Sequence, residues 1–160
     1  MRLNAMKSRL MQQHDVAQVI AIEQSANHYP WSQQNVEDCL KSGYHACVFY
    51  DQADEILGFF IVQQVVDEAH LLNICVKLRV QGQGLGREIL DQIIDYATEI
   101  SAALIVLEVR RSNHRAQQLY LQAGFNEMSV RTDYYPSENG REDAILMGLD
   151  LVPTSFFKVN

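Results

Sequence analysis

The chain has 160 residues, of which 48% are hydrophobic. This length suits one substantial core, so we expect a single domain over residues 1–151, followed by a tail, 152–160. No apolar run reaches the roughly 20 residues of a membrane-spanning helix, and the first residues lack the apolar stretch of a secretory signal. We therefore expect a cytoplasmic protein without a membrane partner. The formal charge of −7 disfavours nucleic-acid binding and is compatible with a cationic substrate.

Three cysteines, Cys39, Cys47 and Cys75, are odd in number and show no CxxC spacing. Neither a disulfide framework nor a zinc site is predicted from them. The five histidines also lack the spacing of metal ligands, so we expect no metal. The cysteines are interpreted as reduced, buried thiols.

The first part of the sequence shows the apolar spacing of helices. A first helix is predicted from about Asp15 to Ala26, and a second after Pro30-Trp31 with Ser32 as its N-cap. The residues that follow helical spacing in the first helix are Val16, Val19, Ile20 and Glu23.

Strand-like segments come next. YHACVFY (44–50), ILGFFIVQQVV (56–66) and HLLNICV (70–76) are rich in β-branched and aromatic residues and are separated by polar turn residues. The pattern predicts an antiparallel meander.

The second half of the chain alternates helices and strands. A stripe of apolar residues that recurs every four positions predicts a helix from Leu85 to about Ile100, and ALIVLEV (103–109) follows as a near-continuous apolar strand. Such a strand indicates burial on both faces and a right-handed parallel crossover.

A further helix is predicted from about Asn113 to Ala123, with Gly124 at its end. FNEMSVRTDYY (125–135) and EDAILMGLDL (142–151), joined by the turn PSENGR, indicate a hairpin. The elements together predict an α/β fold with a mixed, mostly antiparallel sheet, one parallel β-α-β crossover, and helices on both faces.

A glycine-rich loop precedes the third predicted helix, in VQGQGLGREIL (80–90). Helix N-termini carry unpaired N–H groups and a partial positive charge, so glycines that let backbone approach closely can cradle a phosphate. The Walker pattern fails because no Lys-Ser or Lys-Thr follows Gly86, and the dinucleotide pattern fails because Ile89 stands where its third glycine belongs. A phosphate site and a ligand-free turn both remain open on this motif alone.

An acidic residue ends the apolar strand. Leu104, Val106 and Glu108 share one face under a period of two, which puts a carboxylate where an apolar side chain is expected. Because an unpaired buried ion costs several kcal/mol, Glu108 is either paired or functional. The structural alternative is an ion pair with Arg79, Arg110 or Arg111.

Two polar residues of the next predicted helix, Asn113 and Tyr120, are seven positions apart. Residues at this spacing lie on nearly the same helix face if both are helical. On its own, Tyr120 is also explained as a core aromatic.

These segments carry a family resemblance. Residues 81–86, QGQGLG, resemble the Q/R-x-x-G-x-G/A loop of the GNAT superfamily of acetyl-CoA-dependent N-acetyltransferases. LLNICV before the loop, and LEVRRSNHRAQQLYLQAGF and YYPSENGREDAILM after it, resemble the RimI branch of that family over roughly residues 8–150. The resemblance implies the GNAT fold and acetylation of the N-terminal alanine of a small-subunit ribosomal protein, and we expect a monomer.

The resemblance also implies residue roles. Glu108 would be the general base and Tyr120 the general acid, while Asn113 would contact the cosubstrate near the reacting sulfur. Backbone groups of Ile74, Cys75 and Val76 would meet the pantetheine and the acetyl carbonyl. The amides implied to surround the pyrophosphate are those of Gly82, Gln83, Gly84, Leu85, Gly86 and Arg87. The chain departs from the family in having Gly82 where many relatives carry arginine and Lys77-Leu78 where Asp-Pro is common, which bears on affinity for acetyl-CoA.

Acetyl transfer to an amine requires a general base and is helped by a general acid. An α-amino group has a pKa of ~7.7–8.0, so it must lose a proton before it attacks a thioester. Glu108 would take this proton, directly or through a water, and general-base help is typically worth ~10²–10⁴ in rate. Tyr120 would protonate the leaving thiolate, in direct transfer without a metal. Alternatives are a lysine or small-amine (polyamine-like) acetyltransferase, a covalent route through Cys75, and a non-catalytic coenzyme A-binding module.

Overall fold

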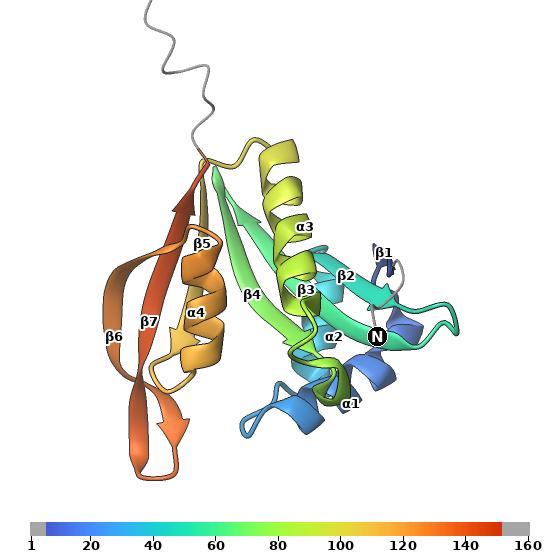
Figure 1. The fold of residues 1–160 in the computed structure, drawn as a ribbon, viewed down its shortest axis with the longest axis horizontal. Helices are drawn as coiled ribbons and strands as arrows, with labels where there is room; N and C mark the ends of the chain where they lie inside the picture. Colours follow the sequence, from blue (N-terminus) through green and yellow to red (C-terminus); the bar gives the residue numbers. More distant parts are fainter. Residues whose placement is uncertain (1–5, 152–160) are drawn as a thin grey trace, which may run out of the picture. The chain divides into compact units, whose positions relative to one another are not determined.

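The computed structural model describes residues 6–151, and the predicted tail, 152–160, lies outside this range. The strand order is β1-β2-β3-β4-β5-β7-β6 (Figure 1). Within the described range the chain groups into two compact units, the first of residues 6–63 and 72–93 and the second of residues 64–71 and 94–151. No helix in residues 6–151 is both long and apolar enough to cross a membrane.

Four strands begin the sheet: β1 (Lys7–Leu10), β2 (His45–Tyr50), β3 (Ile56–Val65) and β4 (Glu68–Val76). β1 pairs antiparallel with β2, and β2 pairs antiparallel with β3. The three predicted strands are confirmed to within two residues at each end. β1 was not predicted, because its four residues are exposed and carry no alternating pattern.

A short 3₁₀ helix and two α-helices follow β1. A short 3₁₀ helix (Gln13–Asp15) leads into α1 (Val16–Ala26), and α2 spans Gln33–Lys41. The Ser32 hydroxyl accepts a hydrogen bond of 3.1 Å from the amide of Asn35, which confirms the predicted N-cap. Asp15 is buried but paired, since both of its carboxylate oxygens accept bonds from the Arg9 guanidinium.

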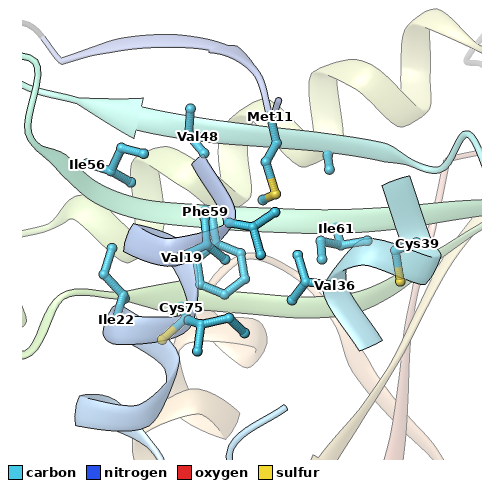
Figure 2. Close-up of a cluster of buried hydrophobic side chains, with 13 residues drawn as sticks. Met11, Val19, Ile22, Val36, Cys39, Val48, Ile56, Phe59, Ile61 and Cys75 are labelled. Atoms are coloured by element: carbon cyan, nitrogen blue, oxygen red, sulfur yellow. The ribbon is translucent and has the colours of Figure 1, made fainter. Parts of the chain in front are cut away.

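The two faces of β3 carry different helices. Successive strand residues point to opposite sides, so Phe59 and Ile61 share one face. Figure 2 shows Val19 of α1 beside Phe59 and Val36 of α2 beside Ile61. This face belongs to one buried cluster, whose members are Met11, Val16, Val19, Ile20, Ile22, Val36, Cys39, Ala46, Val48, Ile56, Phe59, Ile61 and Cys75.

The opposite face of β3 meets α3 (Leu85–Glu99). A Cβ added to Gly58 would lie 2.8 Å from Cδ1 of Ile89 and 3.0 Å from the carbonyl oxygen of Cys75. Gly58 therefore gives α3 its close approach to the sheet. With α1 and α2 on the other face, the prediction of helices on both faces is confirmed for the first unit.

The second unit contains β5 (Leu104–Arg110), α4 (His114–Gln122), β6 (Asn126–Ser137) and β7 (Gly140–Asp150). β4 pairs in parallel with β5 from Glu68↔Leu104 to Leu71↔Leu107. β5 pairs antiparallel with β7, and β7 with β6. The predicted mixed, mostly antiparallel α/β sheet with one parallel crossover is thus confirmed.

Two details of the second unit differ from expectation. β5 is not buried on both faces: Ile105, Leu107 and Val109 are buried, whereas the alternate residues, which include Glu108 and Arg110, are only half-buried. That face is polar toward the end of the strand and finds polar partners on β6 and β7. The hairpin turn is also shorter than the predicted six residues, because β6 continues to Ser137 and β7 begins at Gly140, which leaves Glu138-Asn139 as the turn.

Candidate active site

The residues predicted to bind the cosubstrate and to act on it divide between the two units. The end of β4, the glycine loop and the start of α3 lie in the first unit. Glu108, Asn113 and Tyr120 lie in the second unit.

In the first unit, the end of β4 extends beyond the residues that pair with β5. The parallel register with β5 stops at Leu71, but β4 continues to Val76. Ile74, Cys75 and Val76, which were predicted to offer backbone groups, lie in this continuation. On its other side the strand remains tied to β3, since the amide of Lys77 donates to the carbonyl of Leu57 at 2.8 Å.

The glycine loop follows directly. Gly82 and Gly84 have φ of +78° and +87°, in the left-handed region that glycine tolerates and other residues rarely adopt. The first intrahelical bond of α3 runs from the amide of Glu88 to the carbonyl of Gly84 at 3.2 Å. The amides of Leu85, Gly86 and Arg87 precede that bond, and such first-turn N–H groups have no acceptor within their helix.

This cradle fits a pyrophosphate. The donors are backbone amides at a helix N-terminus, where the helix dipole also favours an anion. A Cβ built on Gly84 meets no atom within 4 Å, so there is open space beside the loop. The side chain of Gln81 donates to the carbonyl of Val76 at 3.0 Å, which ties the loop to the end of β4. Among residues 6–151, no His, Cys, Asp and Glu side chains group in a way that could hold a metal ion.

Beneath β4 lies the buried carboxylate of Glu23, for which the sequence predicted no role in the site. Glu23 of α1 is 2% exposed. Its Oε1 accepts from the amide of Trp31, and its Oε2 accepts from Nδ2 of Asn73, both at 3.2 Å. The signal was present, because Glu23 occupies an apolar-face position in the helical pattern. It connects α1, the segment after α1 and the end of β4.

Cys75 belongs to the same cluster, and its thiol is not activated. Burial, together with the nearby Glu23, raises the pKa of Cys75 to about 12. Burial also raises the pKa of Cys47 to about 11. A thiolate is the nucleophilic form, so neither thiol has the depressed pKa of a reactive cysteine. The interpretation of all three cysteines as buried free thiols is confirmed.

In the second unit, Glu108 is held by β6. Its Oε1 lies 3.2 Å from Nε of Arg131, and its side chain is 24% exposed. The hydroxyl of Tyr134 donates a hydrogen bond to the Glu108 carboxylate, which raises the pKa of Tyr134. The carboxylate is therefore both paired and accessible.

The partner of Glu108, Arg131, was not among the three arginines expected from the sequence. Arg110 bonds to Glu142 at 3.0 Å, Arg111 pairs with Asp143 at 3.2 Å, and Arg79 pairs with Glu55. The reason lies in the strand register. Glu108 lies opposite Leu146 of β7, and Leu146 lies opposite Ser129 of β6, so the same face carries Arg131 two residues further along β6. Sequence proximity could not give this partner.

Tyr120 of α4 is 6% exposed, and its ring centroid lies 5.7 Å from that of Phe125. Burial, and to a lesser extent the neighbouring Tyr135, raises the pKa of Tyr120. Burial and then the charge of Glu108 raise the pKa of Tyr135 to about 12. Tyr135 thus interacts electrostatically with both residues that were predicted to be catalytic.

Asn113 is the N-cap of α4 and not part of the helix. Its Oδ1 accepts from the amide of Ala116 at 3.2 Å. The condition for a shared helical face with Tyr120, that both residues be helical, is not met. The side chain of Asn113 satisfies a helix terminus, and its predicted contact with the cosubstrate stays a prediction.

Comparison with known proteins decides the family. The model of the acetyltransferase (GNAT) family matches residues 14–125. The chain belongs to the GNAT family of acetyltransferases. This GNAT chain is 41% identical over 137 residues to the [ribosomal protein bS18]-alanine N-acetyltransferase of Escherichia coli K12, an alignment that covers 86% of this chain and 92% of that protein. It is 36% identical to the enzyme of the same name from Haemophilus ducreyi, covering 87% and 96% of the two chains.

Solved structures agree with the GNAT assignment. The crystal structure of the ribosomal-protein-S18-alanine N-acetyltransferase from Escherichia coli superimposes with a TM-score of 0.86 at 37% identity, covering 92% of this chain and 94% of that one. The Ard1 structure from Thermoplasma volcanium superimposes with a TM-score of 0.83 at 22% identity, covering 93% and 99%, which shows the shared fold. The resemblance to this family, stated from the sequence motifs, is confirmed.

Proposed function

We propose that this protein transfers the acetyl group of acetyl-CoA to the N-terminal α-amine of a small-subunit ribosomal protein whose first residue is alanine. The reaction is direct transfer within a ternary complex in the cytoplasm. Support for this substrate comes from the names of relatives up to 41% identical over most of the chain. One structural observation carries the chemistry: a partly exposed carboxylate on β5, that of Glu108, is held in place by two side chains of β6.

Glu108 accepts the proton that the acceptor amine must lose. At neutral pH a substantial fraction of an α-amine with a pKa of ~7.7–8.0 is cationic and cannot attack. The carboxylate takes the proton directly or through one water, and its exposure leaves room for either route. Its bonds to Arg131 and Tyr134 fix its orientation.

Tyr120 supplies a proton to the departing thiolate. Burial keeps its hydroxyl neutral, so the proton is present at the pH of the reaction. The same burial makes the phenol a weaker acid than free tyrosine, so Tyr120 gives up its proton only as negative charge develops on the leaving sulfur. Acetyl-CoA supplies the activated acetyl group when bound.

Backbone groups hold acetyl-CoA in this scheme. The amides at the start of α3 bind the pyrophosphate, and backbone groups of residues 74–76 bind the pantetheine arm and the acetyl carbonyl. Glycines at 82 and 84 permit this use of backbone because their φ values are positive. The overall charge of −7 is compatible with a basic acceptor protein.

The test is intact-mass spectrometry with fragmentation. The purified ribosomal protein bS18, mature with alanine first, is incubated with the enzyme and acetyl-CoA, beside an N-terminally blocked lysine peptide and a polyamine. We expect a single acetyl group on the terminal amine, absent with Glu108→Gln. Acetylation of the lysine peptide or the polyamine instead would move the function to the alternative substrate class. Binding of coenzyme A without acetylation of any amine would favour a non-catalytic module.

A further inference from the structure

A bulge of three residues interrupts the hairpin beside Glu108. Arg131 of β6 lies opposite Ala144 of β7, and the next paired residue of β6, Tyr135, lies opposite Glu142. Residues 132–134 therefore oppose the single residue Asp143. We call these three residues the β6 bulge. At its centre Asp133 has φ of +52°, a left-handed conformation that is unfavourable for a residue with a side chain.

Two side chains of β7 hold the β6 bulge, and both do so through its backbone. Arg141 donates from Nε to the carbonyl of Asp133 at 2.8 Å and from Nη2 to the carbonyl of Tyr134 at 2.9 Å. Asp143 accepts from the amide of Asp133 through Oδ1 at 3.0 Å. Its other oxygen pairs with Arg111 at 3.2 Å. Three polar contacts to two consecutive residues specify one conformation of the bulge.

The bulge decides which residues share a face with Glu108. In an unbulged hairpin, residue 133 would lie opposite Glu142, and the side chains would alternate from Arg131 onward. The two extra residues bring Tyr135 to that position instead, where Arg110 lies 4.4 Å from its ring centroid. They also let Tyr134 reach the Glu108 carboxylate.

The side chains on this face support one another. The guanidinium of Arg131 lies 5.4 Å from the ring centroid of Tyr134, and the Tyr134 and Tyr135 rings pack edge to face with centroids 4.9 Å apart. Of the two partners of Glu108, Arg131 directly precedes the β6 bulge and Tyr134 is its last residue, so the reach of Tyr134 to the carboxylate depends on the shape of the bulge. Bulges next to active sites commonly re-aim side chains in this way.

We propose that Arg141 and Asp143 are positioning residues of the acetyl-transfer reaction, which hold the β6 bulge so that Tyr134 and Arg131 orient the Glu108 carboxylate. This inference rests on the role of Glu108 in the proposed function. Arg141 and Asp143 act through the backbone, because their contacts with the bulge are to its carbonyls and its amide.

A double-mutant cycle tests the route of action. Arg141→Ala and Tyr134→Phe are each expected to lower kcat/KM about tenfold, and the double variant is expected to lose little more than either alone, because both changes remove the same orienting contact. If the fold-losses of kcat/KM in the two single variants instead multiply in the double variant, Arg141 does not act through Tyr134. That result would overturn the inference.

Asp143 offers a matched pair of substitutions. Asp143→Asn keeps an oxygen that can accept from the amide of Asp133 and removes the charge that pairs with Arg111. Asp143→Ala removes both. We expect Asn to retain kcat/KM near that of the wild type and Ala to lower it about as much as Arg141→Ala. Equal losses in both variants would contradict a backbone clamp. Glu127→Gln, an exposed change elsewhere on β6, controls for general effects on the strand.

A readout without catalysis separates this inference from the proposed function. In protein labelled with 3-fluorotyrosine, the Tyr134 resonance is assigned by its loss in Tyr134→Phe. We expect Glu108→Gln and Arg141→Ala each to shift this resonance and to lower the pKa of Tyr134. Unchanged acetylation in Glu108→Gln would defeat the proposed function, whereas an unchanged Tyr134 resonance in a folded Arg141→Ala protein would defeat the clamp alone.

Discussion

Glu23 and Asn73 are 50 residues apart in sequence and share a hydrogen bond of 3.2 Å, which the side-chain amide of Asn73 donates to the Glu23 carboxylate. The bond fixes the last turns of α1 beneath the end of β4, whose backbone the proposed function uses. Glu23 also accepts from the amide of Trp31 at 3.2 Å. One buried side chain therefore sets the position of two backbone segments.

Exchanging the two partners should separate charge from position. Asn73→Asp places a second carboxylate against Glu23, so we expect it to lower the melting temperature and raise the KM for acetyl-CoA. Glu23→Gln combined with Asn73→Asp restores a donor and an acceptor in reversed order and should recover most of both properties. Thermal denaturation and steady-state kinetics measure the effect. A double variant as impaired as Asn73→Asp would contradict the pairing as the cause.

Removing the carboxylate of Glu108 should abolish the proton transfer while leaving the fold intact. We expect Glu108→Gln to lower kcat by roughly 10²–10⁴. The melting temperature should change little, because the side chain is only half-buried and its ion pair with Arg131 involves an exposed guanidinium. A folded variant with wild-type kcat would remove Glu108 from the mechanism.

Tyr120 gives a prediction in alkaline solution. Burial raises its pKa above the value of about 10 in unfolded chains, so the folded state holds the proton more tightly than the unfolded state. The stability that this provides is complete below about pH 10 and is lost as the pH rises further. Tyr120→Phe has no proton to lose, so its melting temperature should fall less steeply than that of the wild type between pH 10 and 11. Parallel curves would show that the phenol is not held neutral by burial.

The same substitution tests catalysis at pH 8, where the phenol is protonated in the wild type. We expect Tyr120→Phe to lower kcat roughly 10²-fold, within the usual range for a general acid. Retention of wild-type kcat would leave Tyr120 as a core aromatic.

Alanine substitutions at Gly58 and Gly84 should have different effects, one on stability and the other on the KM for acetyl-CoA. At Gly58 an added methyl group meets Ile89 at 2.8 Å and backbone at 3.0 Å, so Gly58→Ala should cost about 1–3 kcal/mol of folding free energy. At Gly84 the methyl group meets no atom within 4 Å, but φ is +87°. Gly84→Ala should mainly change the loop and raise the KM for acetyl-CoA. Calorimetry and kinetics on both variants test this contrast, and the reverse order of effects would refute it.

Cys75 should be chemically silent. With a pKa of about 12, its thiol is almost wholly protonated at neutral pH. We expect no modification of Cys75 by iodoacetamide in the folded protein at pH 7.5, and near wild-type acetylation by Cys75→Ser. Loss of activity in this variant together with an acetylated cysteine in the wild type would restore the covalent route.

Most of the fold follows from local patterns. Apolar periodicity located α1, α3 and β3, and single residues such as Ser32 and Gly124 marked helix ends through cap chemistry. β1 was missed because an exposed edge strand has no burial pattern to read. The burial of β5 was overestimated because its apolar composition reflects strand preference as well as the interior.

The site was predictable only where its residues are local. The glycine loop is contiguous, so its spacing was enough to indicate a phosphate cradle. Glu108 was noticed because a carboxylate broke an apolar pattern. Its partner Arg131 depends on the order β5-β7-β6 and on the register of β6 against β7, which are set by long-range pairing and leave no nearby signal.

The tight turn between β6 and β7 also contains a site where the protein should deamidate on storage. Asn139 is exposed there, and the residue after it, Gly140, has no side chain to hinder attack of its backbone nitrogen on the asparagine amide. Deamidation at this step would add a negative charge next to Arg141, and its isoaspartate product would also lengthen the backbone. Stored preparations should therefore become heterogeneous first at the hairpin tip, and Asn139→Gln should extend their shelf life.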